Sequence, residues 1–430
     1  MKVQNVKGGY DFLPKEQRVR NYINGILKKT FEEFSYQPIE TPILCYYDIL
    51  SDKYDEGNDI LKEIYKLKDQ GNRELGLRYD LTVPFAKLIA LNKNKIKFPF
   101  KRYEIAKSFR DGPVKVGRDR EFTQCDVDVV GIGGQLIEAE LLSLYMIAFD
   151  RLDIDIIIKY NSRNLMTGLI LESGVCSDLV SDVTTIIDKK NKVSVLEFKE
   201  MLISVGLNEQ QIDKLLNYFN LDVDELCLLF KDNSNEKIQV GLSEIVRLRE
   251  YLKELEMLDI CVFDSSLARG QNYYTGNVFE VYDACGRVSG SIGAGGRYDK
   301  MIKEFINDGE EYPTVGISFG LSSIYEIMKD RDIFNDKSDI NIYIIPLNTE
   351  IESLKLANDL RRLGINVEVE MSSKKVKKCL DYANKEKINY VIVMGEEEIN
   401  NQYFKLKDMF NNNEDIIYMN DVKKILDLIK

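Results

Sequence analysis

The chain has 430 residues, enough for two or three domains, and 44% of them are apolar, so a large buried core is possible. Its 59 Lys and Arg against 71 Asp and Glu give a formal net charge of −12, which argues against a protein that wraps nucleic acid over its whole surface. Histidine is absent, which excludes a Ser-His-Asp triad, histidine-ligated metals and a histidine general base. Any chemistry must use carboxylates, Arg, Lys, Tyr, bound metal or fixed charge.

The cysteines and the N-terminus indicate the compartment. The seven cysteines are an odd number and none forms a CxxC pair, so we expect reduced thiols rather than a disulfide framework or a zinc site. The first residues lack an apolar signal core, and no stretch approaches the roughly 18 apolar residues of a membrane span. The sequence therefore predicts a cytoplasmic protein without a membrane segment and without a metal held by its own side chains.

Helix and strand patterns alternate in the first third of the chain. Helical spacing of apolar residues runs over 15–35, and an extended segment follows over 37–44, where prolines set its end. Two strand-like runs lie between 97 and 131, joined by a polar loop over 111–119 that carries glycine and proline turn signals. An amphipathic helix is predicted over 136–152.

The pattern of apolar residues changes twice over the remainder of the chain. Helical periodicity dominates from 164 to 256, which indicates a helical insertion, and strand patterns return over 259–282 and 314–319. Beyond a charged boundary near 329–339, strands and helices alternate as in a compact α/β module. The predicted domains are a catalytic core over 1–163 and 257–330, the insertion over 164–256, and a C-terminal module over 337–430.

The strand after the polar loop has two different faces. Because side chains alternate along a strand, Cys125, Val127 and Val129 form an apolar face, whereas Gln124, Asp126 and Asp128 share the other with Phe122. A solvated edge strand is one explanation of so polar a face. The neighbouring Arg110 and Arg120 favour a charged ligand instead.

Two glycine-bearing stretches lie late in the chain, over 267–276 and 293–299. The first places Arg269 beside Tyr273 and Tyr274, and the second is a glycine run that lets a ligand approach the backbone. Together they indicate a pocket for a small, polar, anionic molecule. A buried tyrosine pair and a tight turn are the alternative.

These segments resemble the motifs of class II aminoacyl-tRNA synthetases, in particular the histidyl branch. Arg110 with 117–122 resembles motif 2, and 34–42 resembles motif 1. The segments that resemble the histidyl branch itself lie at 7–14, 77–84, 124–128, 269–274 and 295–299. The resemblance covers nearly the whole chain. It implies an α+β fold with an antiparallel-sheet catalytic core, a helical insertion and a C-terminal α/β anticodon-binding-like domain.

The resemblance also implies an activity. Such an enzyme, a histidine–tRNA ligase, joins histidine to ATP, with Mg²⁺, and passes the histidyl group to tRNA(His), and motif 1 implies a homodimer. Charge builds on the phosphoryl oxygens during the first step, so fixed positive charge suffices and no histidine is needed.

Roles follow for individual residues by the same resemblance. Arg110 and Arg269 are the expected catalytic residues, gripping the α-phosphate and the substrate carboxylate, because a guanidinium binds oxyanions in a bidentate way. Arg118 or Arg120 would meet the outer phosphates, and Phe122 would lie against adenine. The residues expected to bind histidine are Asp80, Thr82, Gln124, Asp128, Tyr273, Tyr274 and Gly295.

Within that set, Asp80 and Thr82 would take the ammonium, Gln124 would lie near the carboxylate, and Asp128 and Tyr274 would bond the imidazole nitrogens. In the C-terminal module, phosphates of tRNA are the expected partners of Lys374, Lys375, Lys377 and Lys378. A solvated helix face is the alternative for these lysines.

Three positions depart from the family pattern. Ser323 stands where motif 3 ordinarily has an arginine over ATP, Gly112 where motif 2 has a glutamate, and Asn272 where an acid is usual. Either the chain is a working ligase in which other cations such as Arg297 hold ATP, or it is an impaired paralogue. Such a paralogue would bind histidine or tRNA, as the regulatory subunit of ATP phosphoribosyltransferase does.

Overall fold

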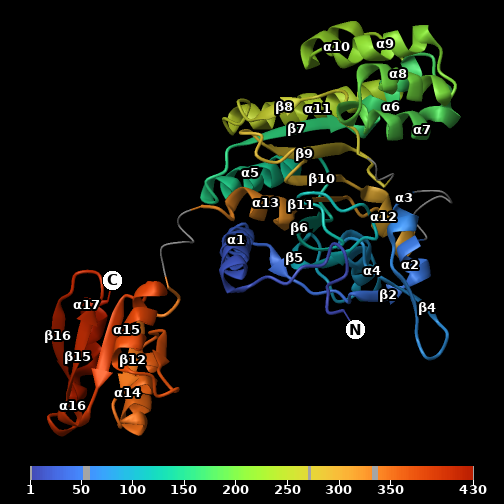
Figure 1. Ribbon diagram of the computed structural model, residues 1–430. Coiled ribbons are helices and arrows are strands. Elements are labelled where there is room, and N and C mark those ends of the chain that lie inside the picture. The colour runs from blue at the N-terminus through green and yellow to red at the C-terminus, as the bar shows by residue number, and fades with distance from the viewer. Residues whose placement is uncertain (1, 52–58, 270–272, 332–337, 430) are drawn as a thin grey trace. The chain divides into compact units, whose positions relative to one another are not determined.

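The computed structural model describes residues 2–51, 59–269, 273–331 and 338–429. The chain divides into two compact units, Met1–Lys329 and Asp330–Lys430 (Figure 1). Each unit is described by itself.

An eight-stranded sheet forms the centre of the first unit. Its strands in spatial order are β1 (Gln37–Pro38), β5 (Phe100–Phe109), β6 (Glu121–Val130), β11 (Thr314–Gly320), β10 (Gly293–Arg297), β9 (Asn277–Asp283), β7 (Ile156–Ser162) and β8 (Cys261–Phe263). The pairs β1–β5 and β7–β8 at the two edges are parallel, and all the other pairs are antiparallel. The antiparallel core that the resemblance predicted is thus confirmed.

Helices cover the apolar face of this sheet. They are α1 (Pro14–Glu33), α5 (Leu136–Arg151) and α13 (Leu321–Met328). The ring of Phe319 lies 5.5 Å from that of Phe31 on α1, and 4.6 and 5.4 Å from those of Tyr145 and Phe149 on α5. All four side chains are fully buried, and burial of each contributes about 1.5–3 kcal/mol. The helical spacing predicted over 15–35 is confirmed by α1.

The opposite, polar face of the sheet is covered by smaller elements. A three-stranded sheet contains β2 (Leu44–Tyr46), β4 (Glu74–Leu77) and β3 (Lys66–Lys68), in that order, and short helices α2 (Tyr47–Ser51) and α3 (Asp59–Glu63) flank it. Helices α4 (Thr82–Asn92) and α12 (Asp299–Ile306) pack on each other. Side chains of α4 and α12 share one buried apolar cluster with Tyr274 and Tyr298, so the polar face lies inside the unit.

Between β7 and β8 the chain forms a group of helices, which Figure 1 shows gathered beyond these two strands. They are α6 (Arg163–Glu172), η1 (Ser177–Leu179), α7 (Val180–Ile187), η2 (Lys190–Lys192), α8 (Val195–Ser204), α9 (Glu209–Phe219), α10 (Val223–Leu229) and α11 (Glu236–Glu254). Helices α6 and α11 lie very close together, since a Cβ on Gly241 would sit 2.2 Å from the backbone nitrogen of Leu165. The helical content expected for this stretch is therefore present.

The second unit has a five-stranded sheet in the order β13 (Val367–Val369), β12 (Ile342–Pro346), β14 (Tyr390–Met394), β15 (Tyr403–Asp408), β16 (Glu414–Tyr418). Its helices are α14 (Glu350–Arg362), α15 (Val376–Lys385), α16 (Glu396–Asn400), η4 (Met419–Lys424) and α17 (Ile425–Leu428). Strands β12 to β14 are parallel, as the alternation of strands and helices predicts. The antiparallel hairpin β15–β16 was not predicted from the sequence.

Candidate active site

Strand register places a stripe of polar residues across the covered face of the large sheet. Residues directly opposite each other in antiparallel strands point to the same face. One row of the stripe contains Glu104, Asp126, Ser318, Ala294 and Glu280, on β5, β6, β11, β10 and β9. The next row contains Arg102, Asp128, Gly316 and Gly296. Strand β6 lies between β5 and β11, so the explanation of its polar face as a solvated edge is wrong.

Two buried arginines hold the acids of this stripe. Arg102 is fully buried, and its guanidinium lies 2.5 Å from a carboxylate oxygen of Asp128 and 4.2 Å from the centre of the Phe85 ring. Arg78 is 2% exposed and donates to Glu104 at 3.1 Å. Because unpaired buried charges cost several kcal/mol, these pairs are what allow the acids to lie inside the unit.

Four acceptor oxygens on this face have no hydrogen-bond partner among the described residues: Asp80 Oδ2, Gln124 Oε1, Asp126 Oδ1 and Asp128 Oδ2, the last of which lies in the ion pair with Arg102. Burial raises the pKa of Asp80 to about 6 and that of Asp126 to about 8, although Arg102 lowers both. Thr82 is half-buried at the start of α4. A ligand that brings hydrogen-bond donors or positive charge would satisfy these oxygens.

Arg269 and the two tyrosines lie at the next part of the stripe. Arg269 is ion-paired with Glu280, and the rings of Tyr273 and Tyr274 lie 4.8 Å apart. Burial raises the pKa of the Tyr274 hydroxyl, and the charge of Arg269 acts in the opposite direction. The neighbouring Gly270 and Gln271, with the unusual Asn272, lie outside the described residues.

The glycines of this region first make room for the protein's own side chains. A Cβ on Gly316 would sit 1.8 Å from Asp128 Oδ1, and one on Gly296, whose φ is +159°, would sit 2.8 Å from the Tyr274 ring. Gly295 faces the other way by alternation, and a Cβ there would sit 2.2 Å from the carbonyl oxygen of Gly316. The structure thus gives Gly295 a packing role, and the predicted contact between Gly295 and histidine gains no support.

The polar loop between β5 and β6 carries the predicted phosphate-binding arginines. Arg110 donates to the carbonyl oxygen of Tyr79 at 2.9 Å, and its guanidinium lies 5.1 Å from the centre of the Phe122 ring. Arg120 bonds Asp111 at 3.0 Å, and Arg118 is 56% exposed with Glu63 at 3.8 Å. Arg110 is therefore anchored, whereas Arg118 is largely exposed to solvent.

The start of α13 touches the same loop. Ser322 donates a hydrogen bond to Asp119 at 2.9 Å, and a Cβ on Gly117 would lie 3.0 Å from the hydroxyl of Ser323. Gly117 has φ +72°, a left-handed conformation that suits the turn between Lys115 and Arg118. Where the family has an arginine over ATP, this chain thus has a serine pair against the loop.

Arg297 lies on the opposite face of the sheet from the polar stripe. It is 5% exposed, on the α5 face of β10, with Glu138 at 2.6 Å, Asp299 at 3.2 Å and the Gly134 carbonyl oxygen at 2.7 Å. The strand register places Arg297 level with Lys101 on β5. Lys101 is eight residues from Phe109, where β5 ends and the loop begins, so Arg297 lies roughly 25 Å from the loop. The prediction that Arg297 binds ATP has no support in this geometry.

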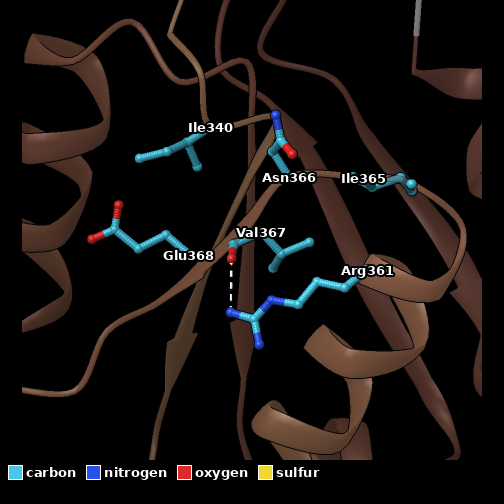
Figure 2. A pocket seen from close by; sticks show the side chains of 7 residues that line it. Ile340, Arg361, Ile365, Asn366, Val367 and Glu368 are labelled. Atoms are coloured by element: carbon cyan, nitrogen blue, oxygen red, sulfur yellow. Dashed lines mark hydrogen bonds between the residues drawn. The ribbon is translucent and has the colours of Figure 1, made fainter. Parts of the chain in front are cut away.

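In the second unit, the four predicted tRNA-binding lysines are all exposed at the start of α15, while Cys379 and Ala383 bury the opposite side of that helix. A pocket of about 430 Å³ opens beside β13 (Figure 2). There Arg361 donates to the carbonyl oxygen of Val367 at 2.8 Å, and Glu368 adds an opposite charge. The lysine cluster lines no part of this pocket.

Comparison with known proteins decides the family. The family model for histidyl-tRNA synthetase matches residues 8–324, and that for the anticodon binding domain matches residues 341–428. The chain belongs to the histidyl-tRNA synthetase family.

Individual relatives of the family agree along nearly the full length. The chain is 43% identical over 420 residues to histidine–tRNA ligase 1 of Bacillus cereus, covering 96% of this chain and 97% of the relative. It is 42% identical over 408 residues to histidine–tRNA ligase 2 of Shouchella clausii, covering 94% and 96%. The crystal structure of histidyl-tRNA synthetase from Nostoc sp. PCC 7120 superposes with a TM-score of 0.84 at 28% identity, covering all of both chains.

The histidyl-tRNA synthetase fold uses residues that the sequence reasoning did not assign. They are Arg78, Arg102, Glu104, Glu280 and Tyr298. A signal was present for two of them: pairing the strands symmetrically about the 111–119 loop sets Arg102 opposite Asp128 and Glu104 opposite Asp126. The other three come from segments far apart in the sequence, and no local pattern predicts their partners.

Proposed function

We propose that this chain is a histidine–tRNA ligase, which activates histidine with ATP and transfers the histidyl group to tRNA(His). The observation that carries the proposal is the match to named histidine–tRNA ligases along 96% of the chain, catalytic and anticodon-binding parts included. The impaired paralogue is not favoured by these relatives.

For the first step, the histidine carboxylate attacks the α-phosphate of ATP and pyrophosphate leaves. Arg110 and Arg269 are the proposed catalytic residues, because a guanidinium binds oxyanions in a bidentate way and the two lie beside Phe122 and Glu280 of the polar face. The backbone oxygen of Tyr79 and the carboxylate of Glu280 hold their guanidinium groups in place. Such fixed charge stabilises the developing phosphoryl charge without a proton-transfer group.

The histidine itself would lie along β6. We assign its ammonium to Asp80 and Thr82, its carboxylate to Gln124, and its ring to Asp128, Tyr273 and Tyr274. Support comes from the shared burial of Asp80, Asp128 and Tyr274 and from the unsatisfied Oδ2 of Asp80, which the ammonium would satisfy, whereas Gln124 would use its amide NH2 as the donor to the carboxylate.

ATP would lie over the loop. We assign its phosphates to Arg110, Arg118 and Arg120 and its adenine to Phe122. Among the described residues no group of three acidic or cysteine side chains is placed to hold a metal ion. We therefore propose that Mg²⁺ arrives with ATP, since Mg²⁺ typically keeps substrate phosphates and water among its ligands.

The tRNA would contact Lys374, Lys375, Lys377 and Lys378 through its phosphates, because all four are exposed on the anticodon-binding domain.

We also propose that the enzyme is a cytoplasmic homodimer. Next to motif 1, Ile43, Leu44 and Tyr46 are 41–49% exposed, an apolar surface that a second copy would cover. Leu44→Glu should then give a monomer by light scattering, and an unchanged dimer would reject this surface. No helix in the described ranges is long and apolar enough to cross a membrane.

Charging of a tRNA(His) transcript with labelled histidine tests the proposal. We expect charging that depends on ATP, and Arg269→Ala should reduce adenylate formation by at least about 100-fold while the melting temperature stays near that of the wild type. A wild-type protein that binds histidine but charges no tRNA(His) would support the paralogue instead.

A further inference from the structure

Asp126 lies at the middle of the polar stripe and has no role in the assignments above. It is 3% exposed, between Glu104 on β5 and Ser318 on β11, and between Gln124 and Asp128 on its own strand. The Ser318 hydroxyl bonds its carboxyl group, but Oδ1 has no partner among the described residues. A buried polar atom without a partner is costly, so this oxygen indicates a ligand group.

Asp128, two residues along, differs in this respect. One of its oxygens accepts from the Tyr298 hydroxyl, and the other lies 2.5 Å from the guanidinium of Arg102. The charge of Asp128 is thus compensated by Arg102, although its Oδ2 has no hydrogen bond by geometry, whereas Asp126 Oδ1 has neither a hydrogen bond nor an ion pair among the described residues. Within the site, Asp126 is the better-placed acceptor for a new hydrogen bond.

A comparison of the buried acids with the arginines near them also indicates that Asp126 contacts a ligand. Four fully buried acids lie in the covered face, Asp80, Glu104, Asp126 and Asp128, against the buried arginines Arg78 and Arg102, and the charge of Arg110 also acts on Asp80. Arg78 pairs with Glu104, and Arg102 lies nearest Asp128. A ligand with two separated donor groups would therefore satisfy Asp80 and Asp126 together.

Position along β6 says which donor reaches Asp126. Starting from the phosphate-binding loop, the residues on this face are Phe122, Gln124 and then Asp126, one strand repeat of about 6.8 Å further on. The substrate carboxylate must lie at the loop end, because it attacks the α-phosphate. The ring is the part of histidine that extends away from it, toward Asp126 and the neighbouring Tyr274.

We propose that Asp126 is a specificity-determining residue, whose free Oδ1 accepts a hydrogen bond from the ring N–H of the substrate imidazole. This rests on the proposed histidine–tRNA ligase function. A site with a buried acceptor rejects analogues without a donor, because the acceptor is then left unpaired.

The test uses the full-length enzyme and two substrates, histidine and β-(2-thiazolyl)-L-alanine, whose ring has a nitrogen but no N–H. Pyrophosphate exchange gives kcat/KM for each substrate with the wild type and with Asp126→Asn. We expect Asp126→Asn to lower kcat/KM for histidine by about 10- to 100-fold and to leave that for the thiazole unchanged or higher, with KM for ATP unchanged. Preference for histidine over the thiazole should shrink accordingly.

Asp119→Asn is the matched control, since it removes a carboxylate at the other end of the same hairpin and should leave that preference as in the wild type. Equal losses for both substrates in Asp126→Asn would place the ammonium, common to both, at this residue and overturn the proposal, as would an unchanged preference. Should Asp126→Asn fail to fold, Asp126→Ser gives the same comparison. A wild type without histidine-dependent exchange would reject the proposed function, which is a different outcome.

Discussion

Arg102 shows how a single side chain organises the interior of the catalytic unit. Its guanidinium is fully buried, pairs with Asp128, lies against the Phe85 ring and is 3.8 Å from Glu104. Such a group is costly to bury, but removing it is costlier, because the acids would then remain without a counter-charge.

We therefore expect Arg102→Ala to lower the free energy of unfolding of the first unit by about 3–5 kcal/mol, measured by urea denaturation. Arg118→Ala is the control, because Arg118 is 56% exposed and its pair with Glu63 spans 3.8 Å, and it should change stability by less than about 1 kcal/mol. Equal small effects would show that the buried network is not needed for stability.

Asp126 also makes stability depend on pH. Burial raises its folded-state pKa to about 8, above the unfolded value of about 3.9, so the folded protein binds the extra proton. This stability is present below pH 4 and is lost as the pH rises toward 8. Asp126→Asn cannot ionise, so relative to the wild type it should gain at least about 1.4 kcal/mol between pH 5 and pH 8. A pH-independent difference would contradict the raised pKa.

The loop between β5 and β6 is the element that we propose links the histidine site to ATP. The turn is held at three places: Gly8 accepts from the backbone nitrogen of Arg120 at 2.9 Å, Arg120 pairs with Asp111, and Ser322 bonds Asp119. Because Ser322 belongs to α13, the helix position and the loop position are coupled.

Ser322→Ala should raise KM for ATP about tenfold with little change in kcat or in KM for histidine, because one hydrogen bond to a carboxylate is lost. Ser322→Thr should restore the wild-type KM, since it keeps the hydroxyl. Ser323→Ala serves as the neighbouring control. A Ser322→Ala enzyme with unchanged KM for ATP would mean that the loop is held without this bond.

Elements with a strong local period were predictable, and those set by distant partners were not. The period of α1 predicted its buried face, and the alternation in β6 separated an apolar face from a polar one, although both faces are buried from Cys125 onward. Pairing the hairpin symmetrically would have shown the Arg102–Asp128 pair. The pairing of Arg297 with Glu138 spans 159 residues, so its sequence motif suggested a ligand contact instead. Strands β15 and β16 were missed because they are only six and five residues long, and Ile417 is the one buried residue of β16, so that strand has no alternating pattern.

At the scale of the whole molecule, the histidine–tRNA ligase function offers an explanation for the absence of histidine. A ligase for histidine is most needed when charged tRNA(His) is scarce, and a chain of 430 residues without a histidine codon needs none for its own synthesis. The proposed chemistry permits this, because in it arginines and buried acids supply the charge.

Under histidine limitation, we therefore expect synthesis of this protein to continue when histidine-containing proteins of similar length slow several-fold, as measured by pulse labelling. A variant with exposed lysines outside the proposed sites changed to histidine, such as Lys231→His and Lys253→His, should slow with the latter group. If both versions slow equally, the absence of histidine has no effect on synthesis.

The most direct measurement is amino-acid-dependent exchange of pyrophosphate into ATP by the purified wild-type chain, with Mg²⁺ and each standard amino acid in turn. We expect exchange with histidine alone, despite Ser323 at the position of the usual arginine. Binding of histidine without any exchange would contradict this expectation.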